Sequence, residues 1–297
     1  MSCGRIALER AWIKVDKYFA SEIDKYAIQV SEKNYPDIIR LWDVNNWRDW
    51  DIWEIDMIIG GSPCQWFSFA GKQLAFDDPR SKLFFTMVDI INHFKPKYFL
   101  LENVKMKKEY QDIITEYMGV QPIEINSSLV SAQNRRRLYW VGERQEDGTY
   151  KQVHIEQPKD KWILLKDIIE EDGEDIADFK NCVRKNIVWV NILNYLWDNW
   201  FVCIPVKSWF QDHKIWITKT PTLRAWNSFC LIQTPSWGIR TITPIEAERL
   251  QTVPDWYTSI VSNSQRYKML GNWWTVDVIA HIFSFLQEEI WKNKNNQ

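Results

Sequence analysis

The chain has 297 residues, of which 45% are hydrophobic and 26% charged, a composition typical of soluble globular proteins with one or two domains. No apolar run approaches the roughly 20 residues that span a bilayer, and the amino terminus lacks the apolar segment of a secretion signal. The five scattered cysteines and four unpaired histidines indicate neither a disulfide framework nor a metal site. We therefore expect a cytoplasmic protein with no membrane segment and no bound metal.

The formal net charge of -2 weighs against a uniformly basic, nucleic-acid-binding surface. Charge is local, however, and residues 105–108 and 135–137 form two basic clusters. We expect the lysines of the first cluster to lie on a solvated face, while the arginines of the second precede an apolar strand.

Helical and extended patterns alternate along the first half of the chain. We predict helices over 6–12, 26–33 and 82–94, and strands over 15–20, 38–41, 55–59 and 98–101. This alternation predicts an α/β fold with a mostly parallel, doubly wound sheet. The chain opens at Met1-Ser2-Cys3-Gly4, already in the turn that would follow a first strand. That strand is expected to be missing, through a start codon assigned too late or a true truncation.

The second half of the chain changes character twice. Short segments with many turn signals run over residues 143–238, which predicts a smaller, irregular domain with a hairpin turn at 146–148 and an acidic, solvent-facing loop at 170–175. Residues 239–297 are expected to return to the first domain, formed by 1–142. Thr243 before Pro244 predicts the start of a helix that ends near residue 251, and apolar spacing predicts a last helix over 276–291.

A cysteine lies just past the carboxyl end of a predicted buried strand. The strand at 55–59 leads into Gly60-Gly61-Ser62-Pro63-Cys64-Gln65, and ligands of open α/β sheets bind beyond the carboxyl ends of strands. A free cysteine is also commonly a small buried hydrophobe, so this stretch alone leaves both interpretations open.

Two more groups suited to catalysis follow. Glu102 ends the next predicted strand, and a thiolate and a carboxyl group at neighbouring strand ends suit attack on an electron-poor ring whose nitrogen must be protonated. A solvated strand end is the other interpretation of Glu102. Gln133-Asn134-Arg135-Arg136-Arg137 then precedes an apolar strand, on which Arg135 and Arg137 face the same side.

Taken together, these motifs resemble the DNA (cytosine-5)-methyltransferase family of the bacterial and phage type over nearly the whole chain. The Gly-Gly-Ser-Pro-Cys-Gln stretch with Phe67-Ser68 is similar to the family's catalytic loop, and Glu102-Asn103-Val104 to its acid motif. Gln133, Arg135 and Arg137 match its Gln-x-Arg-x-Arg motif. Residues 240–250, and Gly271-Asn272 with Val276, resemble its ninth and tenth motifs.

The resemblance implies a fold and a reaction. The fold is a Rossmann-like S-adenosylmethionine-dependent methyltransferase sheet with a smaller target-recognition domain at residues 143–238. Cys64 would add to C6 of a cytosine flipped out of duplex DNA, while Glu102 bonds N3 and the exocyclic amine. C5 would then take the methyl group and lose its proton. Arg137 would hold the base, Arg135 would support the loop, and Gln133 would be a positioning group.

The resemblance also implies a cofactor site and partners. S-adenosylmethionine would be bound by a set of residues that includes Glu22 for the ribose and Asp43-Val44 for the adenine; the complete set is Gly4, Glu22, Asp43, Val44, Pro63, Asn272 and Val276. The partner is double-stranded DNA, with a restriction endonuclease of the same specificity as a further candidate, and a monomer is expected. The recognition sequence, and the choice between a restriction-modification enzyme and a solitary phage enzyme, stay open.

Tryptophan and glycine contents depart from the norm. The chain has 19 tryptophans and 10 glycines, so glycine is about 3% of residues against an average of about 7%. Tryptophan stands where the family has glycine or where a turn calls for it; these fifteen positions are Trp12, Trp42, Trp53, Trp66, Trp162, Trp189, Trp197, Trp200, Trp209, Trp216, Trp226, Trp237, Trp256, Trp273 and Trp291.

Two explanations of this pattern stay open. Our hypothesis is a gene that reads UGA as glycine, translated with a table that reads it as tryptophan. We then expect the chain as written to fold poorly and to be inactive. The other explanation is an aromatic-rich binding protein.

Two other functions also stay open. A catalytically inactive DNA-binding remnant would fit the absent first strand and Trp66. A tRNA cytosine-5 methyltransferase would share the Pro-Cys and Glu-Asn-Val motifs, although the Gly-Gly-Ser-Pro-Cys-Gln form favours the DNA enzymes.

Overall fold

A computed structural model describes residues 1–61, 79–170, 203–205, 219–220, 222–223, 230–233 and 239–295. Cys64, Pro63 and Trp66 lie outside the described residues, as does most of the predicted target-recognition region. Across the described residues, no helix combines the length and apolar character that a membrane crossing requires.

The main sheet has five strands. Four follow the order β3-β4-β6-β5, and the fifth, β7, pairs with the carboxyl-terminal end of β6. Its strands are β3 (Met57–Gly61), β4 (Tyr98–Val104), β5 (Pro122–Asn126), β6 (Arg136–Arg144) and β7 (Tyr150–Gln152). β3 and β4 are parallel, whereas β6 runs antiparallel to both β4 and β5. The short connection from β5 to β6 allows only an antiparallel pair, so this half of the sheet departs from the mostly parallel prediction.

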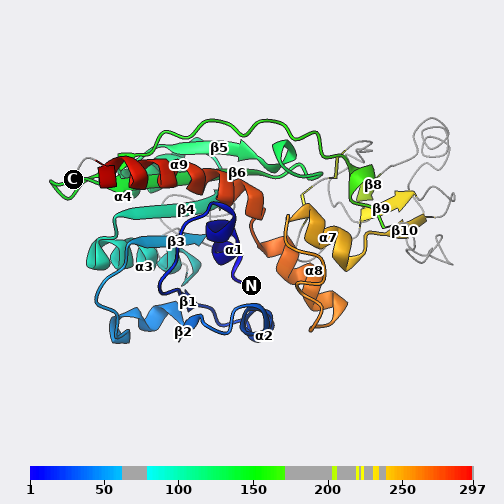
Figure 1. The fold of residues 1–297 in the computed structure, drawn as a ribbon, viewed down its shortest axis with the longest axis horizontal. Coiled ribbons are helices and arrows are strands. Elements are labelled where there is room, and N and C mark those ends of the chain that lie inside the picture. Colours follow the sequence, from blue (N-terminus) through cyan, green and yellow to red (C-terminus); the bar gives the residue numbers. More distant parts are fainter. Residues whose placement is uncertain are drawn as a thin grey trace.

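Two smaller sets of strands accompany the main sheet. β1 (Phe19–Ser21) and β2 (Ile39–Trp42) form a parallel pair, which Figure 1 shows beyond β3. β8 (Cys203–Pro205), β9 (Cys230–Gln233) and β10 (Ile239–Thr241) form an antiparallel sheet at the opposite end of the molecule from the carboxyl terminus. Among the described strands, β1 and β3 are not hydrogen-bonded to each other, so the predicted single sheet is divided here.

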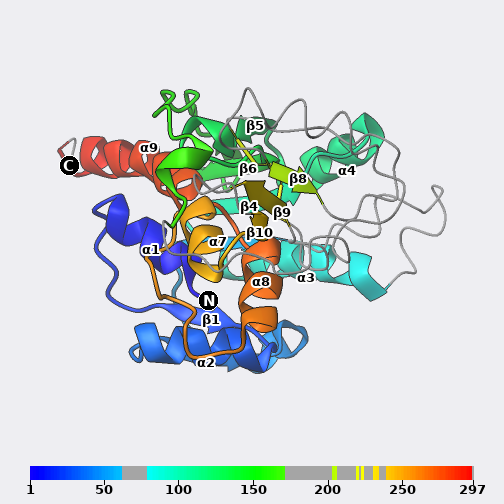
Figure 2. The same ribbon diagram turned by 90° about the vertical axis from the view of Figure 1, so that its right-hand side faces the viewer.

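Helices cover both faces of the main sheet. Figure 2 shows α1 (Cys3–Arg10) and α9 (Val276–Asn295) on one side, with α3 (Pro79–Phe94) and α4 (Lys108–Met118) on the other. The remaining helices and short 3₁₀ turns are α2 (Lys25–Asn34), η1 (Val44–Asp49), η3 (Ser127–Leu129), η4 (Leu165–Asp167), α7 (Pro244–Leu250) and α8 (Asn263–Asn272).

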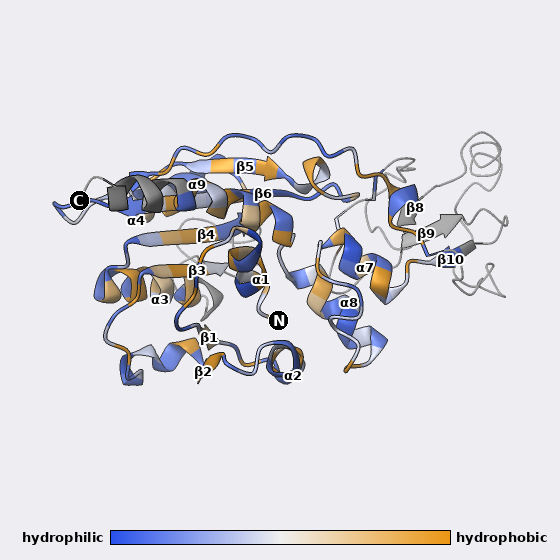
Figure 3. Ribbon diagram, in the orientation of Figure 1, coloured by the Kyte–Doolittle hydropathy of each residue, from blue (hydrophilic) through white to orange (hydrophobic). Residues whose placement is uncertain are grey.

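The apolar run at the start of β4 is explained by burial on both faces. Tyr98 and Leu100 pack into the core beneath α1 and α9, while Phe99 and Leu101 pack into the core beneath α3 and α4. Because successive side chains of a strand point to opposite faces, a strand covered on both sides reads as continuously apolar. Figure 3 shows the corresponding hydrophobic segment within β4.

α7 begins as the sequence predicts. The hydroxyl of Thr243 accepts the backbone N–H of Glu246, and the Glu246 carboxylate accepts the backbone N–H of Thr243, which completes a capping box with Pro244 in the first turn. Glu246 also holds the buried Arg240 at 2.6 Å. Glu170, the first residue of the predicted acidic loop, is half-buried, and its backbone N–H and carbonyl join this network through Glu246 and Arg240; residues 171–175 lie outside the described residues.

Most other predicted elements are present with shifted ends. The first helix covers 3–10 rather than 6–12, and the strand predicted at 15–20 shortens to Phe19–Ser21. The hairpin turn forms, with Gly148 at φ 85° between β6 and β7. The domain division at 142 stays a prediction, and the main sheet itself continues past it to Gln152.

Four tryptophans adopt left-handed backbone conformations. They are Trp12, Trp42, Trp162 and Trp256, with φ between 55° and 65°. All four belong to the positions where glycine was expected. Trp291 does not fit that expectation, because it lies inside α9, where no turn calls for glycine.

Candidate active site

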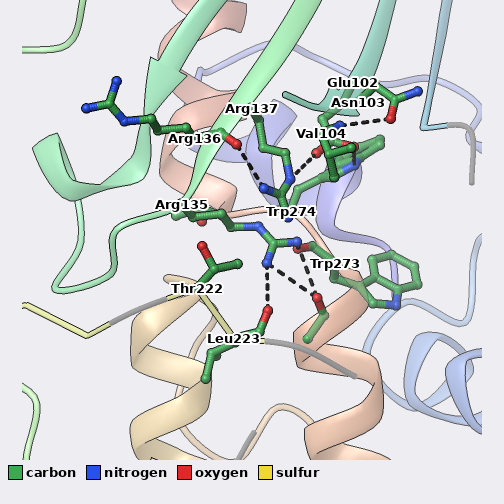
Figure 4. Close-up of polar contacts among 12 residues, drawn as sticks. Glu102, Asn103, Val104, Arg135, Arg136, Arg137, Thr222, Leu223, Trp273 and Trp274 are labelled. Carbon is green, nitrogen blue, oxygen red and sulfur yellow. Dashed lines mark hydrogen bonds and ion pairs between the residues drawn. The ribbon is translucent and has the colours of Figure 1, made fainter. Parts of the chain in front are cut away.

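Glu102 lies at the carboxyl end of β4 with both carboxylate oxygens engaged. Its Oε1 is 3.0 Å from Nε of Arg137, and its Oε2 accepts a hydrogen bond of 3.2 Å from the indole Nε1 of Trp274 (Figure 4). The residue is 8% exposed, so the solvated strand end considered from the sequence is not observed. A nearly buried carboxylate held by a cation and a neutral donor has one fixed orientation.

Gly61 brings the end of β3 directly against this carboxylate. It pairs in register with Glu102, and a Cβ added to Gly61 would lie 3.0 Å from Oε2 of Glu102 and 3.3 Å from Nε1 of Trp274. A side chain at position 61 would therefore displace the carboxylate or the indole. This close approach explains the second glycine of the Gly-Gly-Ser-Pro-Cys stretch.

Three consecutive arginines diverge as strand alternation predicts. Arg135 and Arg137 turn toward the site, whereas Arg136 points away (Figure 4) and pairs with Glu124 at 3.1 Å. Arg137 contacts Glu102 directly. Arg135 is buried and donates to three backbone carbonyls in two other segments, those of Leu223 and of Gly271 and Trp273.

Gln133 is fully buried and shares with Arg135 a contact to Leu223. Its Nε2 donates to the carbonyl of Leu250 at 3.1 Å, and its Oε1 accepts the backbone N–H of Leu223 at 2.9 Å. Apart from a longer contact of Gln133 with the side chain of Gln251, Gln133 and Arg135 thus act on backbone atoms in the described part of the site. This geometry is compatible with the positioning and supporting roles that the resemblance implies for them.

Tyr139 stands opposite Glu102 on the neighbouring strand β6. Burial, reinforced by the nearby Glu102 carboxylate, raises the pKa of Tyr139 well above its usual range. Its hydroxyl therefore stays protonated at any physiological pH and does not serve as a base.

The candidate cofactor residues lie at the ends of other elements. Glu22 follows β1, and its Oε1 accepts the backbone N–H groups of Ile23 and Asp24. Asp43 follows β2, and its Oδ1 accepts the backbone N–H of Asn45 at 2.9 Å. Carboxylates at the ends of two paired parallel strands suit the hydroxyl groups of a nucleoside.

Four other predicted cofactor residues also have defined places. Gly4 lies in α1, where an added Cβ would be 2.2 Å from Cδ1 of Ile59, so a larger residue would require the Ile59 side chain to move. Val44 begins η1, and Asn272 is the exposed last residue of α8. Val276 begins α9 and is fully buried, so its side chain serves the core.

Trp274 is the functional candidate that sequence reasoning missed. Its hydrogen bond to Glu102 joins residues 172 positions apart, and no local sequence pattern predicts such a contact. The lysines of the other basic cluster are exposed beside carboxylates, for example Lys105 with Glu124 at 2.8 Å and Lys108 with Asp112 at 2.8 Å. The described part of the chain holds no group of three or more His, Cys, Asp or Glu placed to bind a metal ion.

The fold is that of known methyltransferases. The structure is similar to the Entamoeba histolytica methyltransferase EhMeth, with a TM-score of 0.70 and 16% identity over 97% of this chain and 95% of that one. It is also similar to the S. pombe Dnmt2 methyltransferase, with a TM-score of 0.65 and 19% identity over 97% and 96%. The predicted α/β methyltransferase fold is confirmed.

The chain belongs to the C-5 cytosine-specific DNA methylase family, whose family model matches residues 2–288. It is 32% identical to the Type II methyltransferase M1.ScrFI of Lactococcus lactis subsp. cremoris over 95% of this chain and 74% of that protein. It is 31% identical to the Type II methyltransferase M.NlaX of Neisseria lactamica over 94% and 90%.

These relationships define the activity. The protein is a DNA (cytosine-5)-methyltransferase, as the motifs predicted, and neither an inactive remnant nor a tRNA methyltransferase is favoured.

Proposed function

We propose that methyl transfer proceeds through Cys64 and Glu102. The Cys64 thiolate adds to C6 of the target cytosine, while Glu102 bonds N3 and the exocyclic amine so that the ring accepts the electron pair. C5 would then bond to the methyl carbon as the sulfur–methyl bond of the donor breaks, so that the donor leaves as a neutral thioether. The C5 proton would pass to water, and the electron pair of the C5–H bond would restore the C5–C6 double bond as the C6–sulfur bond breaks, which releases the Cys64 thiolate and 5-methylcytosine. Arg137 holds Glu102 and the base in register.

The observation that carries this proposal is the fixed carboxylate of Glu102 beside the end of β3. Gly61 pairs with Glu102, and Cys64 follows Gly61 by three residues. Three residues of extended chain reach about 10 Å at most. The nucleophile is thus tethered within a short distance of the acid that the mechanism pairs with it.

The methyl donor we propose is S-adenosylmethionine, which supplies an electrophilic methyl group on a sulfonium. Glu22 and Asp43 provide acceptors for hydroxyl and amine groups at the ends of β1 and β2, which supports a nucleoside in this place. Val44, Asn272 and Gly4 of α1 complete the proposed site, with Pro63 of the catalytic loop and with Val276 contributing through its backbone.

The substrate we propose is duplex DNA, from which the cytosine is extruded because C5 and C6 are inaccessible in the stack. Residues 143–238 read the sequence around it. The Type II methyltransferases among the relatives favour a restriction endonuclease of the same specificity as partner. We expect the enzyme to act as a monomer in the cytoplasm.

The test measures transfer of a labelled methyl group to duplex DNA. Cys64→Ser is expected to abolish transfer, and Glu102→Gln to lower kcat by about 10²- to 10⁴-fold. Cys230→Ser, which changes a cysteine on β9, is the matched control and keeps its activity. All variants are made in the chain as written and in a glycine-substituted chain, which carries glycine at the fifteen tryptophan positions.

A second measurement follows the covalent step itself. In DNA with 5-fluorocytosine at the target, C5 has no proton to lose, so a DNA–protein adduct should accumulate through Cys64. Turnover by Cys64→Ser in the glycine-substituted chain, or an adduct on another residue, would contradict the proposal.

A further inference from the structure

The two oxygens of Glu102 are held by donors of different chemistry. Arg137 brings a full positive charge to Oε1, whereas Trp274 brings a neutral N–H to Oε2. An indole N–H restrains a carboxylate without adding charge to the site. Gly61 lies on a third side of the carboxylate, where an added Cβ would be 3.0 Å from Oε2 and would press on it.

We propose that Trp274 is a positioning residue, which fixes the carboxyl group of Glu102 in the orientation that the cytosine requires. This inference rests on the proposed role of Glu102. With a partner on each oxygen, rotation of the carboxyl group breaks one ion pair and one hydrogen bond, so the group stays oriented when the base arrives.

The backbone on both sides of Trp274 is held in place. The carbonyl of Trp273 accepts from Arg135 at 2.9 Å, and the hydroxyl of Thr275 donates to Oε1 of Gln251 at 2.9 Å. Gln133 contacts that same Oε1 through its Nε2 at 3.4 Å. The Gln-x-Arg-x-Arg motif therefore reaches Glu102 by two routes: directly through Arg137, and indirectly through the segment that presents the indole.

The deciding variant is Trp274→Phe in the glycine-substituted chain, which keeps an aromatic ring and removes the N–H. A hydrogen bond to a charged group of this kind predicts a fall in kcat of about 10- to 100-fold. The KM values for DNA and for S-adenosylmethionine should change by less than about 3-fold, because the contact orients a reacting group.

Trp140→Phe is the matched control. Trp140 also donates its indole N–H, to the hydroxyl of Thr115 at 3.0 Å, but it lies in the core beneath α3 and α4. Its loss should lower Tm and leave kcat unchanged. If Trp274 were merely structural, its variant would behave in the same way.

A double variant separates this inference from the proposed function. In a Glu102→Gln background, Trp274→Phe should lower kcat by less than about 3-fold more, because the residue acts through Glu102. An unchanged kcat in Trp274→Phe, or an equal loss in both backgrounds, would overturn the inference while leaving the role of Glu102 intact. Full activity of Glu102→Gln would overturn both.

A second inference rests on the backbone. Trp12, Trp42, Trp162 and Trp256 combine left-handed φ values with exposures of 86%, 61%, 75% and 61%. The four tryptophans outside the glycine-like set, which are Trp47, Trp50, Trp140 and Trp274, all lack a positive φ. Within that second group Trp47 and Trp140 are buried, at 6% and 0% exposure.

The backbone hydrogen bonds around Trp12 and Trp256 are those of positions that glycine usually occupies. The N–H of Trp12 bonds the carbonyl of Glu9, and the N–H of Ile13 bonds the carbonyl of Leu8. These two bonds form the motif that ends a helix with a glycine in the left-handed conformation, at the position that Trp12 occupies. Trp256 is the third residue of a turn closed by the Tyr257 N–H and the Pro254 carbonyl, where a positive φ again calls for glycine.

We infer that positions 12, 42, 162 and 256 are glycine in the natural polypeptide, encoded by UGA. The test reads the gene and, by mass spectrometry, the peptides of the protein isolated from its source. UGA codons and glycine are expected at these four positions, with UGG codons at Trp47 and Trp140. UGG codons or tryptophan-containing peptides at the four positions would overturn the inference.

Discussion

Replacing the four left-handed tryptophans by glycine should stabilise the polypeptide as written. A left-handed conformation costs an L-residue about 1–2 kcal/mol. Glycine offsets part of this gain, because its unfolded state is more flexible by about 0.5–1 kcal/mol. The net gain is about 0.5–1 kcal/mol at each site. Since Trp12, Trp42, Trp162 and Trp256 lie far apart in the sequence and none is in contact with another in the described hydrogen bonds, the gains should add to about 2–4 kcal/mol.

The assay is thermal unfolding followed by circular dichroism. For a chain of this size about 1 kcal/mol shifts Tm by roughly 2 °C, so the quadruple variant should unfold about 4–8 °C higher. Trp140→Gly is the opposing control, because it removes a fully buried ring and should cost at least about 3–5 kcal/mol. A quadruple variant with an unchanged or lower Tm would refute the argument from backbone conformation.

Three further predictions concern other parts of the fold. Glu246→Ala leaves the buried Arg240 without the carboxylate that holds it at 2.6 Å, and should lower the free energy of unfolding by about 3–5 kcal/mol in a denaturant titration, whereas Glu246→Gln should cost less. Burial raises the pKa of the Cys3 thiol to about 11, so from about pH 9 to 11 the folded state keeps a proton that the unfolded state loses; stability should fall across that range, and Cys3→Ala should remove this part of the slope. Arg135→Lys should lower Tm, because an ammonium group does not reproduce the guanidinium fork that spans three backbone carbonyls; an unchanged Tm would show that the fork is dispensable.

The sequence predicted those parts of the fold that depend on interactions between residues close together in the sequence. The capping box of α7 depends on Thr243, Pro244 and Glu246, which are neighbours in sequence. The opposed directions of Arg136 and Arg137 follow from strand alternation in β6, which begins at Arg136. The glycine-like Trp12 was recognisable because turn chemistry is also local, whereas Trp256 was identified through the resemblance to the family.

Contacts between distant segments were beyond prediction from the sequence. The indole of Trp274 meets Glu102 only because α8 and α9 return across the carboxyl ends of β3 and β4. The sequence predicts that Glu170 belongs to an acidic, solvated loop. In the structure its backbone N–H donates to Glu246 and its carbonyl accepts from Arg240, and these two residues form a buried ion pair. Which residues meet in this way depends on the path of the whole chain through the fold, and hydrophobic periodicity contains no information about that path.

Gln133 and Arg135 hold their neighbours by main-chain atoms. The groups they contact at Leu223, Leu250 and Gly271 are carbonyl oxygens or an N–H, which every residue except proline supplies alike. These hydrogen bonds therefore fix the main chain at residue 223, and they make no demand on the side chain that residue carries.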